Sequence, residues 1–82
     1  MKKAILLLAE GFEEGESLLT IDILRRCDIQ CDSVSIDKRK VKGCNGIISI
    51  SDYVLNEVNF NDYDMIILPG GMPGAKNLSL NK

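Results

Sequence analysis

Apolar and polar positions along the chain predict three strands. Residues 4–9, in KKAILLLAE, form a continuous apolar run with charged residues on both sides. Such a run is typical of a strand that is buried on both faces, as in parallel sheets. The segment CDSVSID at 31–37 alternates between polar and apolar positions, which predicts a second strand. The segment DMIILP at 64–69 predicts a third strand of the core, and a helix is expected to start near residue 74.

A helix is predicted between residues 14 and 27, because apolar residues recur there at spacings of three and four. These residues are Leu18, Leu19, Ile21, Ile23, Leu24 and Cys27. Glutamates crowd the first turn, and Arg25 and Arg26 lie in the last turn, as the helix dipole favours. The apolar arc is wide, so we expect this helix to contact more than the sheet.

The middle of the chain predicts a hairpin. Asn45–Gly46 lies between two β-prone segments, and this dipeptide favours a type I′ turn. The basic stretch KRKVK at 38–42 is expected to be a solvated loop, and the polar residues 52–63 are compatible with a short helical turn. The whole order predicts an α/β fold with an open, mostly parallel sheet. One full helix does not cover both faces of such a sheet, so we expect an incomplete domain.

Composition and charge narrow the classes of function. The chain has 82 residues, of which 45% are hydrophobic and 27% charged, as in an ordinary small globular domain. The net charge of −2 argues against nucleic acid as a partner, because phosphate binding needs clustered positive charge. No stretch approaches the ~20 apolar residues of a membrane span. The run at 4–9 is also too short for the core of a signal peptide, so we expect a cytoplasmic protein without membrane contact.

The cysteines do not predict a metal site. Cys27, Cys31 and Cys44 form no C-x-x-C pair, and the chain contains no histidine. A tetrahedral zinc site needs four soft ligands, so we expect no metal and no other cofactor. The three thiols are expected to be reduced and mostly packed in the interior.

The segment LPGGMPGAKNL at 68–78 contains a candidate binding site. A P-loop and a dinucleotide fingerprint both fail, because Ala75 and Met72 stand where those motifs require glycine. Without side chains, Gly70 and Gly71 let a ligand approach the backbone and direct N–H groups at a negatively charged oxygen. The alternative is a tight turn that needs glycine only for its dihedral angles.

Glu16 is a second candidate. It follows the first predicted strand, at the edge where open α/β sheets place their ligands. Local sequence alone offers a simpler explanation, which is a first-turn glutamate that complements the helix dipole. The residues around Glu16 favour this simpler explanation.

Two sequence motifs, taken together, resemble those of a known protein family. GFEEGE at 11–16 and YDMIILPGGMPGAKNL at 63–78, about fifty residues apart, resemble the ThiJ/PfpI superfamily, the Parkinsonism-associated deglycase family. The resemblance runs over the whole chain and includes VKGCNGIISISD between the two motifs. It implies a flavodoxin-like α/β sandwich, of which residues 1–82 are the N-terminal portion of a single domain, and usually an obligate homodimer.

The resemblance also implies an active site around a reactive cysteine on a sharp strand-to-helix elbow. In the family, the glutamate that matches Glu16 hydrogen-bonds this cysteine and helps to keep it a thiolate. The glycines that match Gly70 and Gly71 offer backbone amides at the oxyanion position. The elbow lies downstream of the PGG motif, so the nucleophilic cysteine is expected to be absent from this chain.

Family activities include glutathione-independent glyoxalase and deglycase chemistry on methylglyoxal adducts, peptidase or chaperone roles, and oxidative-stress sensing. We therefore expect an inactive part of a cysteine-dependent enzyme that acts on a small carbonyl substrate. It is expected to form a homodimer or to associate with a missing C-terminal half. The alternative is a small non-catalytic module that binds or dimerises through its wide-faced helix.

Overall fold

The computed structural model describes residues 2–69, and Met1 and residues 70–82 lie outside the described part. The helices and strands are β1 (Lys3–Leu8), α1 (Glu14–Arg26), β2 (Gln30–Ser35), β3 (Lys40–Lys42), β4 (Ile48–Ile50), β5 (Tyr53–Val54), the 3-10 turns η1 (Leu55–Glu57) and η2 (Phe60–Asp62), and β6 (Met65–Ile67). The predicted helix and the three predicted strands are confirmed, with small differences at their ends. The helix expected near residue 74 lies outside the described residues.

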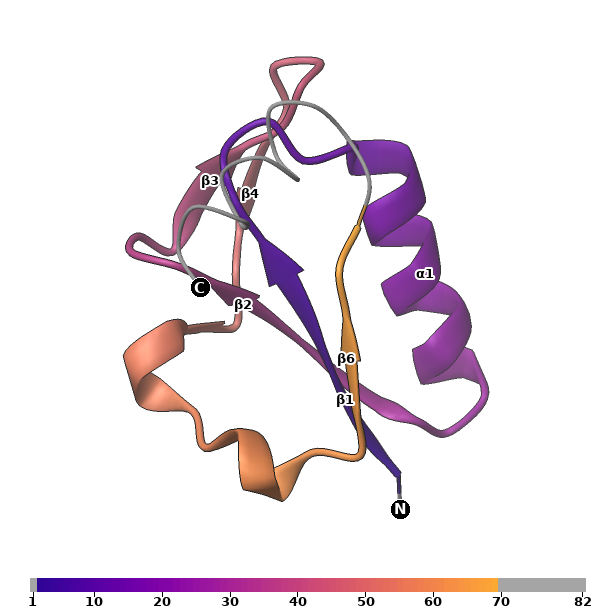
Figure 1. Cartoon of the computed structure of the whole chain (residues 1–82). Coiled ribbons are helices and arrows are strands. Elements are labelled where there is room, and N and C mark those ends of the chain that lie inside the picture. The colour runs from indigo at the N-terminus through magenta and orange to yellow at the C-terminus, as the bar shows by residue number, and fades with distance from the viewer. Residues whose placement is uncertain (1, 70–82) are drawn as a thin grey trace.

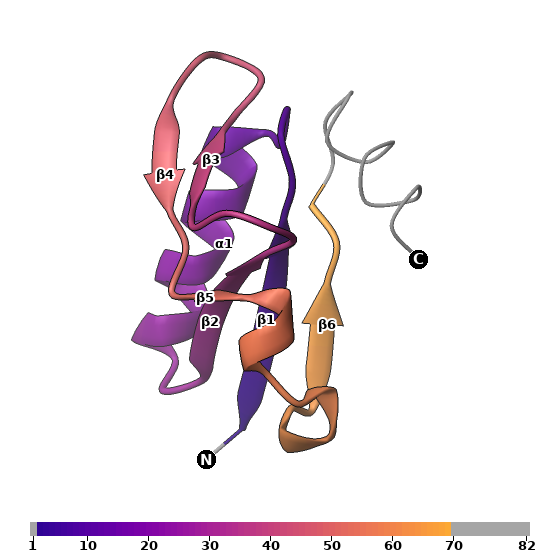
Figure 2. The ribbon, with the colours of Figure 1, turned by 90° about the vertical axis from the view of Figure 1, so that its left-hand side faces the viewer.

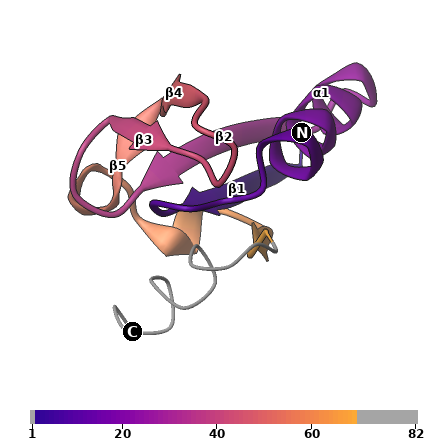
Figure 3. The same cartoon turned by 90° about the horizontal axis from the view of Figure 1, so that it is seen from above.

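Four strands form a parallel sheet in the order β5–β2–β1–β6 (Figure 1). Strands β3 and β4 form a separate antiparallel hairpin. Figures 2 and 3 show α1 and this hairpin on the same side of the parallel sheet, whereas η1 and η2 lie on the other side. The mostly parallel α/β architecture predicted from the order of the elements is therefore confirmed.

The hydrophobic core lies between α1, the hairpin and the sheet. Its buried members are Ala4, Leu6, Leu8, Phe12, Ile21, Cys31 and Val41. Strand β1 is buried on both faces as its continuous apolar run predicts, and Ile5 on the side away from α1 has no exposed surface. Helix α1 contributes only part of its apolar arc to this core, because Leu18, Leu19 and Ile23 are about half exposed.

The segment that carries η1 and η2 is tied to the side of the sheet away from α1. The hydroxyl of Tyr63 donates a hydrogen bond to Asp32 Oδ2 at 2.7 Å, and Gln30 Nε2 donates to the same oxygen at 3.2 Å. These donors compensate the buried Asp32 carboxylate. Burial and this carboxylate raise the pKa of Tyr63, so the phenol stays protonated as a donor.

The predicted hairpin is confirmed, but its turn is not type I′. Gly43 N–H donates to Ile47 O at 2.9 Å, and Gly46 N–H donates to Gly43 O at 3.1 Å, which leaves a three-residue loop, 44–46. Gly46 has a positive φ of 84°, whereas Asn45 does not. A type I′ turn needs positive φ at both central residues, so this loop is instead a type I turn followed by a left-handed glycine.

Two further expectations need correction. The basic stretch 38–42 is not wholly a solvated loop, because its last three residues form β3 and Val41 is buried in the core. Strand β6 is not a strand of the buried core, since Met65 and Ile66 are 49% and 48% exposed. Within residues 2–69, β6 pairs only with β1, which leaves one side of it open.

The carboxyl end of α1 is closed by a Schellman motif that lacks the usual glycine. Asp28 N–H donates to Arg25 O at 3.2 Å, and Ile29 N–H donates to Leu24 O at 3.0 Å. Asp28 has a φ of 62°, in the left-handed region that disfavours residues with a β-carbon. This position therefore stores a local backbone strain.

Replacing Asp28 with glycine is expected to raise the free energy of unfolding by about 1 kcal/mol, because glycine adopts this φ without the β-carbon clash. Urea unfolding of the two proteins would measure the difference. The matched control is Asp28→Asn, which removes the charge near the helix end but keeps the β-carbon. Equal stabilisation by asparagine and glycine would show that charge, rather than backbone strain, is responsible.

Candidate functional site

The carboxyl ends of β1 and β6 lie side by side at one edge of the sheet. The strands are parallel with Leu6 opposite Ile67, and continuing this register places Pro69 beside Leu8. The loop after β1 leaves from the same edge and leads to Glu16 in the first turn of α1 (Figure 1). Gly70 and Gly71 follow Pro69 but lie outside the described residues, so their expected oxyanion role stays a prediction.

The first turn of α1 is fixed by a side-chain cap. Glu13 has an extended backbone conformation, and its Oε1 accepts the N–H of Gly15 at 2.6 Å and that of Glu16 at 3.4 Å. An acidic cap also complements the helix dipole. Glu16 is exposed in this turn, and its carbonyl accepts the hydroxyl of Thr20 at 2.7 Å. Glu16 therefore sits on a capped helix start at the edge of the sheet, as its place in the sequence predicts.

Glu14 is a polar centre that the sequence analysis did not identify. Its side chain is almost completely buried, with 1% of the residue exposed. Its Oε2 accepts the N–H of Asn45 at 2.9 Å and that of Ile47 at 3.0 Å, and its Oε1 accepts Asn45 Nδ2 at 3.1 Å. The thiol of Cys44 lies 3.5 Å from Oε1. This carboxylate therefore joins the first turn of α1 to the loop between β3 and β4.

Opposing effects set the pKa of Glu14. Burial raises it, but hydrogen bonds from the N–H of Ile47 and from both nitrogens of Asn45 outweigh burial, so the pKa lies below its ordinary value. Gly43 makes this arrangement possible. A β-carbon at that position would lie 2.5 Å from Glu14 Oε2 and closer still to Cδ and Cγ of the same side chain.

A signal for Glu14 is present in the sequence. Ile21, Ser17 and Glu14 are the buried residues of α1, and they follow one another at helical spacings of four and three. The buried face of the helix contains Ile21, and the same spacing towards the N-terminus leads to Glu14. This spacing predicts that Glu14 is buried and not exposed to solvent. Its partners, in contrast, are about thirty residues away in sequence, and no local pattern identifies them.

The cysteines differ from expectation in their exposure. Cys31 is buried, but Cys27 and Cys44 are exposed, so the prediction of mostly packed thiols is wrong. Burial raises the pKa of Cys31 even though Arg25 opposes it, and burial and the Glu14 carboxylate raise the pKa of Cys44. A reactive cysteine needs the opposite shift, because the thiolate is the nucleophile. These surroundings do not activate Cys31 or Cys44.

Neither a metal-binding cluster nor a membrane-spanning helix is found in the described part of the chain. Within residues 2–69, no three side chains of the metal-binding types gather closely enough to hold a metal ion. None of the helices in this part has the length and apolar character needed to cross a membrane. Of the three expected site residues, only Glu16 lies in the described part, and its catalytic role stays a prediction.

Known proteins are similar in sequence to nearly the whole of this chain. The model of the DJ-1/PfpI family matches residues 2–82. Protein DJ-1alpha of Drosophila melanogaster is 38% identical over 79 residues, which cover 94% of this chain and 36% of the fly protein. The glutathione-independent glyoxalase DJR-1.2 of Caenorhabditis elegans is 35% identical over 79 residues, which cover 95% of this chain and 42% of the worm protein.

A solved structure extends the comparison to three dimensions. A DJ-1 superfamily protein from Salmonella typhimurium superposes with a TM-score of 0.90 at 38% identity, covering 98% of this chain and 44% of that chain. This chain thus spans less than half the length of each of these relatives. The superposition shows that the sheet and α1 are part of the flavodoxin-like DJ-1 fold. The match of the family model over nearly the whole sequence shows that the chain belongs to the DJ-1/PfpI family.

Proposed function

We propose that this chain contributes the glutamate side of a cysteine-dependent active site that acts on a small carbonyl compound such as methylglyoxal. The observation that carries this proposal is the parallel register of β1 and β6. It brings the first turn of α1 and the chain leading to Gly70 to the same edge of the sheet. The C. elegans relative named a glutathione-independent glyoxalase supports this class of reaction.

In this proposal the nucleophile comes from a segment beyond the 82 residues. A thiolate attacks the substrate carbonyl, the Glu16 carboxyl in its protonated form donates a hydrogen bond to the thiolate, and the amides of Gly70 and Gly71 stabilise the negative oxygen that forms. The raised pKa values of Cys31 and Cys44 support this division, because neither thiol is activated where it lies. The 82-residue chain by itself is therefore expected to be inactive.

Methylglyoxal turnover tests the proposal. The chain would be assayed alone and as a fusion to the part of the Salmonella relative that it does not cover. We expect no turnover above buffer for the chain alone, and turnover by the fusion that thiol alkylation abolishes. Alkylation-sensitive turnover by the chain alone would contradict the proposed division of the site. A folded fusion that leaves methylglyoxal unchanged would reject this substrate class.

A second candidate function is association between two copies, without catalysis. Leu18, Leu19 and Ile23 on α1 are exposed, and Ile48 and Ile50 on β4 are exposed by 62% and 70%. Figures 2 and 3 place α1 and β4 on the same side of the sheet. Large apolar patches are rare on soluble monomers, so these residues support a self-association surface.

We expect the isolated chain to sediment as a dimer or larger species at micromolar concentration, because association covers this apolar surface. The double variant Leu19→Lys/Ile50→Lys should shift the population towards monomer, since it places charge on both elements. The matched control is Ile66→Lys, which adds a charge to β6 instead. A compact, cooperatively unfolding wild-type monomer would contradict the expectation. An equal effect of the β6 control would show that added charge, and not the surface of α1 and β4, controls the association.

A further inference from the structure

The two side edges of the parallel sheet differ in how their backbone groups are satisfied. At one edge, β5 is short and pairs with β2 only at Val34 and Ser35. The preceding part of β2 therefore has no strand beside it on that side within residues 2–69. Unpaired N–H and C=O groups on such an edge are a template for pairing with another chain.

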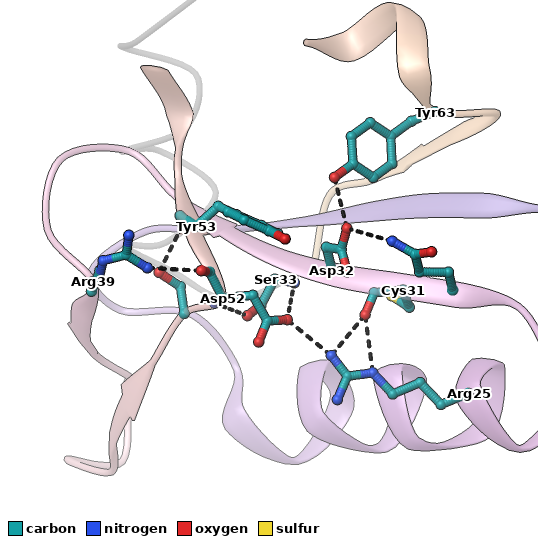
Figure 4. Close-up of polar contacts among 10 residues, drawn as sticks. Arg25, Cys31, Asp32, Ser33, Arg39, Asp52, Tyr53 and Tyr63 are labelled. Atoms are coloured by element: carbon teal, nitrogen blue, oxygen red, sulfur yellow. Dashed lines mark hydrogen bonds and ion pairs between the residues drawn. The ribbon is translucent and has the colours of Figure 1, made fainter. Parts of the chain in front are cut away.

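Two side chains occupy the hydrogen-bonding positions that a neighbouring strand would use there (Figure 4). From α1, Arg25 donates to the carbonyl oxygen of Cys31 through Nε at 3.0 Å and through Nη2 at 2.8 Å. From the residue before β5, Asp52 Oδ2 accepts the N–H of Ser33 at 3.0 Å. The two side chains also pair with each other, with Nη2 2.9 Å from Oδ2.

The contact between Asp52 and Ser33 is reciprocal. The N–H of Asp52 donates to the hydroxyl of Ser33 at 2.8 Å, so this position of β2 is held by both backbone and side chain. Cys31 and Ser33 are buried, whereas the side chains of Arg25 and Asp52 are 53% and 41% exposed. The charged groups of Arg25 and Asp52 therefore lie at the surface and cover the buried strand β2.

A second arginine–carboxylate pair continues the cover along β5. Arg39 Nη2 donates to both carboxylate oxygens of Glu57 at 2.7 and 2.8 Å, and its Nη1 donates to the carbonyl of Asp52 at 2.8 Å. Glu57 Oε1 in turn accepts the N–H of Val54 at 2.9 Å. The outer N–H group of β5 is therefore also occupied by a side chain.

The opposite edge has no such cover in the described part of the chain. Among residues 2–69, no side chain hydrogen-bonds to the backbone of β6. Met65, Ile66 and Leu68 are about half exposed there. An exposed ion pair by itself contributes little to the free energy of unfolding, so the effect of Arg25 and Asp52 lies mainly in the backbone groups of β2 that they occupy.

We propose that Arg25 and Asp52, extended by Arg39 and Glu57, close the β5–β2 edge against pairing with a strand of another molecule. Among residues 2–69, this leaves only the β6 side of the sheet open to the addition of a strand. This inference does not depend on the proposed catalytic role, because it rests on contacts away from Glu16. Its consequence is that loss of the closing pair opens a second edge.

The test compares two charge-neutral double variants of the 82-residue chain. Arg25→Ala/Asp52→Ala removes the closing pair, and Arg26→Ala/Asp22→Ala removes the exposed ion pair on α1, with 3.2 Å between its charged atoms, which covers no strand. We expect exchange of the Ser33 amide hydrogen with solvent to be at least tenfold faster in the first variant. We also expect thioflavin T-positive assemblies to grow at least tenfold faster. The second variant should match wild type in both measurements.

Two single variants, Asp52→Asn and Asp52→Ala, keep the test decisive if the first double variant folds poorly. Asp52→Asn retains an oxygen that accepts the Ser33 N–H, so it should protect this amide nearly as well as wild type, whereas Asp52→Ala should not. Equal exchange and assembly rates for wild type, Asp52→Asn and Asp52→Ala would overturn the proposal. Equal acceleration by the Arg26 and Asp22 control would also overturn it, because the loss of any exposed ion pair would then be sufficient.

Discussion

Replacing Gly43 with alanine is expected to lower the free energy of unfolding by more than about 2 kcal/mol. The three atoms nearest to the added β-carbon all belong to the side chain of Glu14. That side chain is buried and held by hydrogen bonds to the loop, so it cannot move aside without breaking them. Thermal unfolding would measure the change, with an expected fall in Tm of about 8 °C or more for a chain of this size.

A double-mutant cycle separates this contact from a general intolerance at position 43. In a Glu14→Ala background the clashing atoms are absent, so Gly43→Ala should then cost less than about 0.5 kcal/mol. Gly46, whose added β-carbon would meet only the end of Lys42 at 3.9 Å, is strained by its φ instead. Gly46→Ala should therefore cost the same in both backgrounds. An unchanged cost of Gly43→Ala without Glu14 would show that the contact is not responsible.

The carboxylate of Glu14 also predicts that the free energy of unfolding depends on pH. The pKa of Glu14 in the folded chain lies below its ordinary value of 4.5. Its stabilising contribution is therefore complete above that value and is lost as the pH falls through the folded pKa. Between wild type and Glu14→Gln, the difference in unfolding free energy should shrink as the pH falls below about 4.5. A difference that stays constant from pH 7 to pH 3 would mean that ionised Glu14 adds no stability.

In the fusion with the Salmonella relative, Glu16→Leu is expected to reduce kcat/KM for methylglyoxal at pH 7 by about tenfold or more. A charge-assisted hydrogen bond to a thiolate contributes roughly 1.5–3 kcal/mol, which corresponds to a thiol pKa lower by about one to two pH units. Without Glu16, a smaller fraction of the cysteine is thiolate at neutral pH. Initial rates measured from pH 5 to pH 10 would show the loss.

Two further variants show whether a slower rate in Glu16→Leu comes from the lost hydrogen-bond donor or from a change of the helix surface. Glu16→Gln keeps a hydrogen-bond donor, so its rate should fall between those of wild type and Glu16→Leu. Asp22→Leu places the same apolar side chain at another exposed acidic position of α1 and should leave the rate unchanged. If Asp22→Leu reduces the rate as much as Glu16→Leu, the effect belongs to the helix surface and not to the site.

The sequence predicted those elements whose signals are local. Strand β1 follows from a continuous apolar run, and α1 follows from helical spacing, an acidic start and a basic end. Strand β5 has two residues, which is too short to give a pattern of its own. The turn type of the loop 44–46 was predicted incorrectly, and the contacts of this loop are distant in sequence, since Glu14 takes the N–H groups of Asn45 and Ile47.

In the candidate site, too, local sequence predicts some features, whereas others depend on contacts between residues far apart in the sequence. The position of Glu16 follows from the order of strand and helix, because ligands of open α/β sheets lie at the carboxyl ends of the strands. The role of Glu14 depends on a contact across about thirty residues, and no spacing within α1 reveals its partners. The roles of Gly70 and Gly71 remain predictions, since both residues lie outside the described part.

The most direct test of the proposed site is the pH dependence of cysteine alkylation in the fusion, followed by mass spectrometry of the peptide that carries the reactive cysteine. In wild type we expect a thiol pKa about one to two pH units below the ordinary ~8.5. Glu16→Gln should raise it part of the way and Glu16→Leu further. Three overlapping titration curves would contradict the account and leave Glu16 as a residue that only begins a helix.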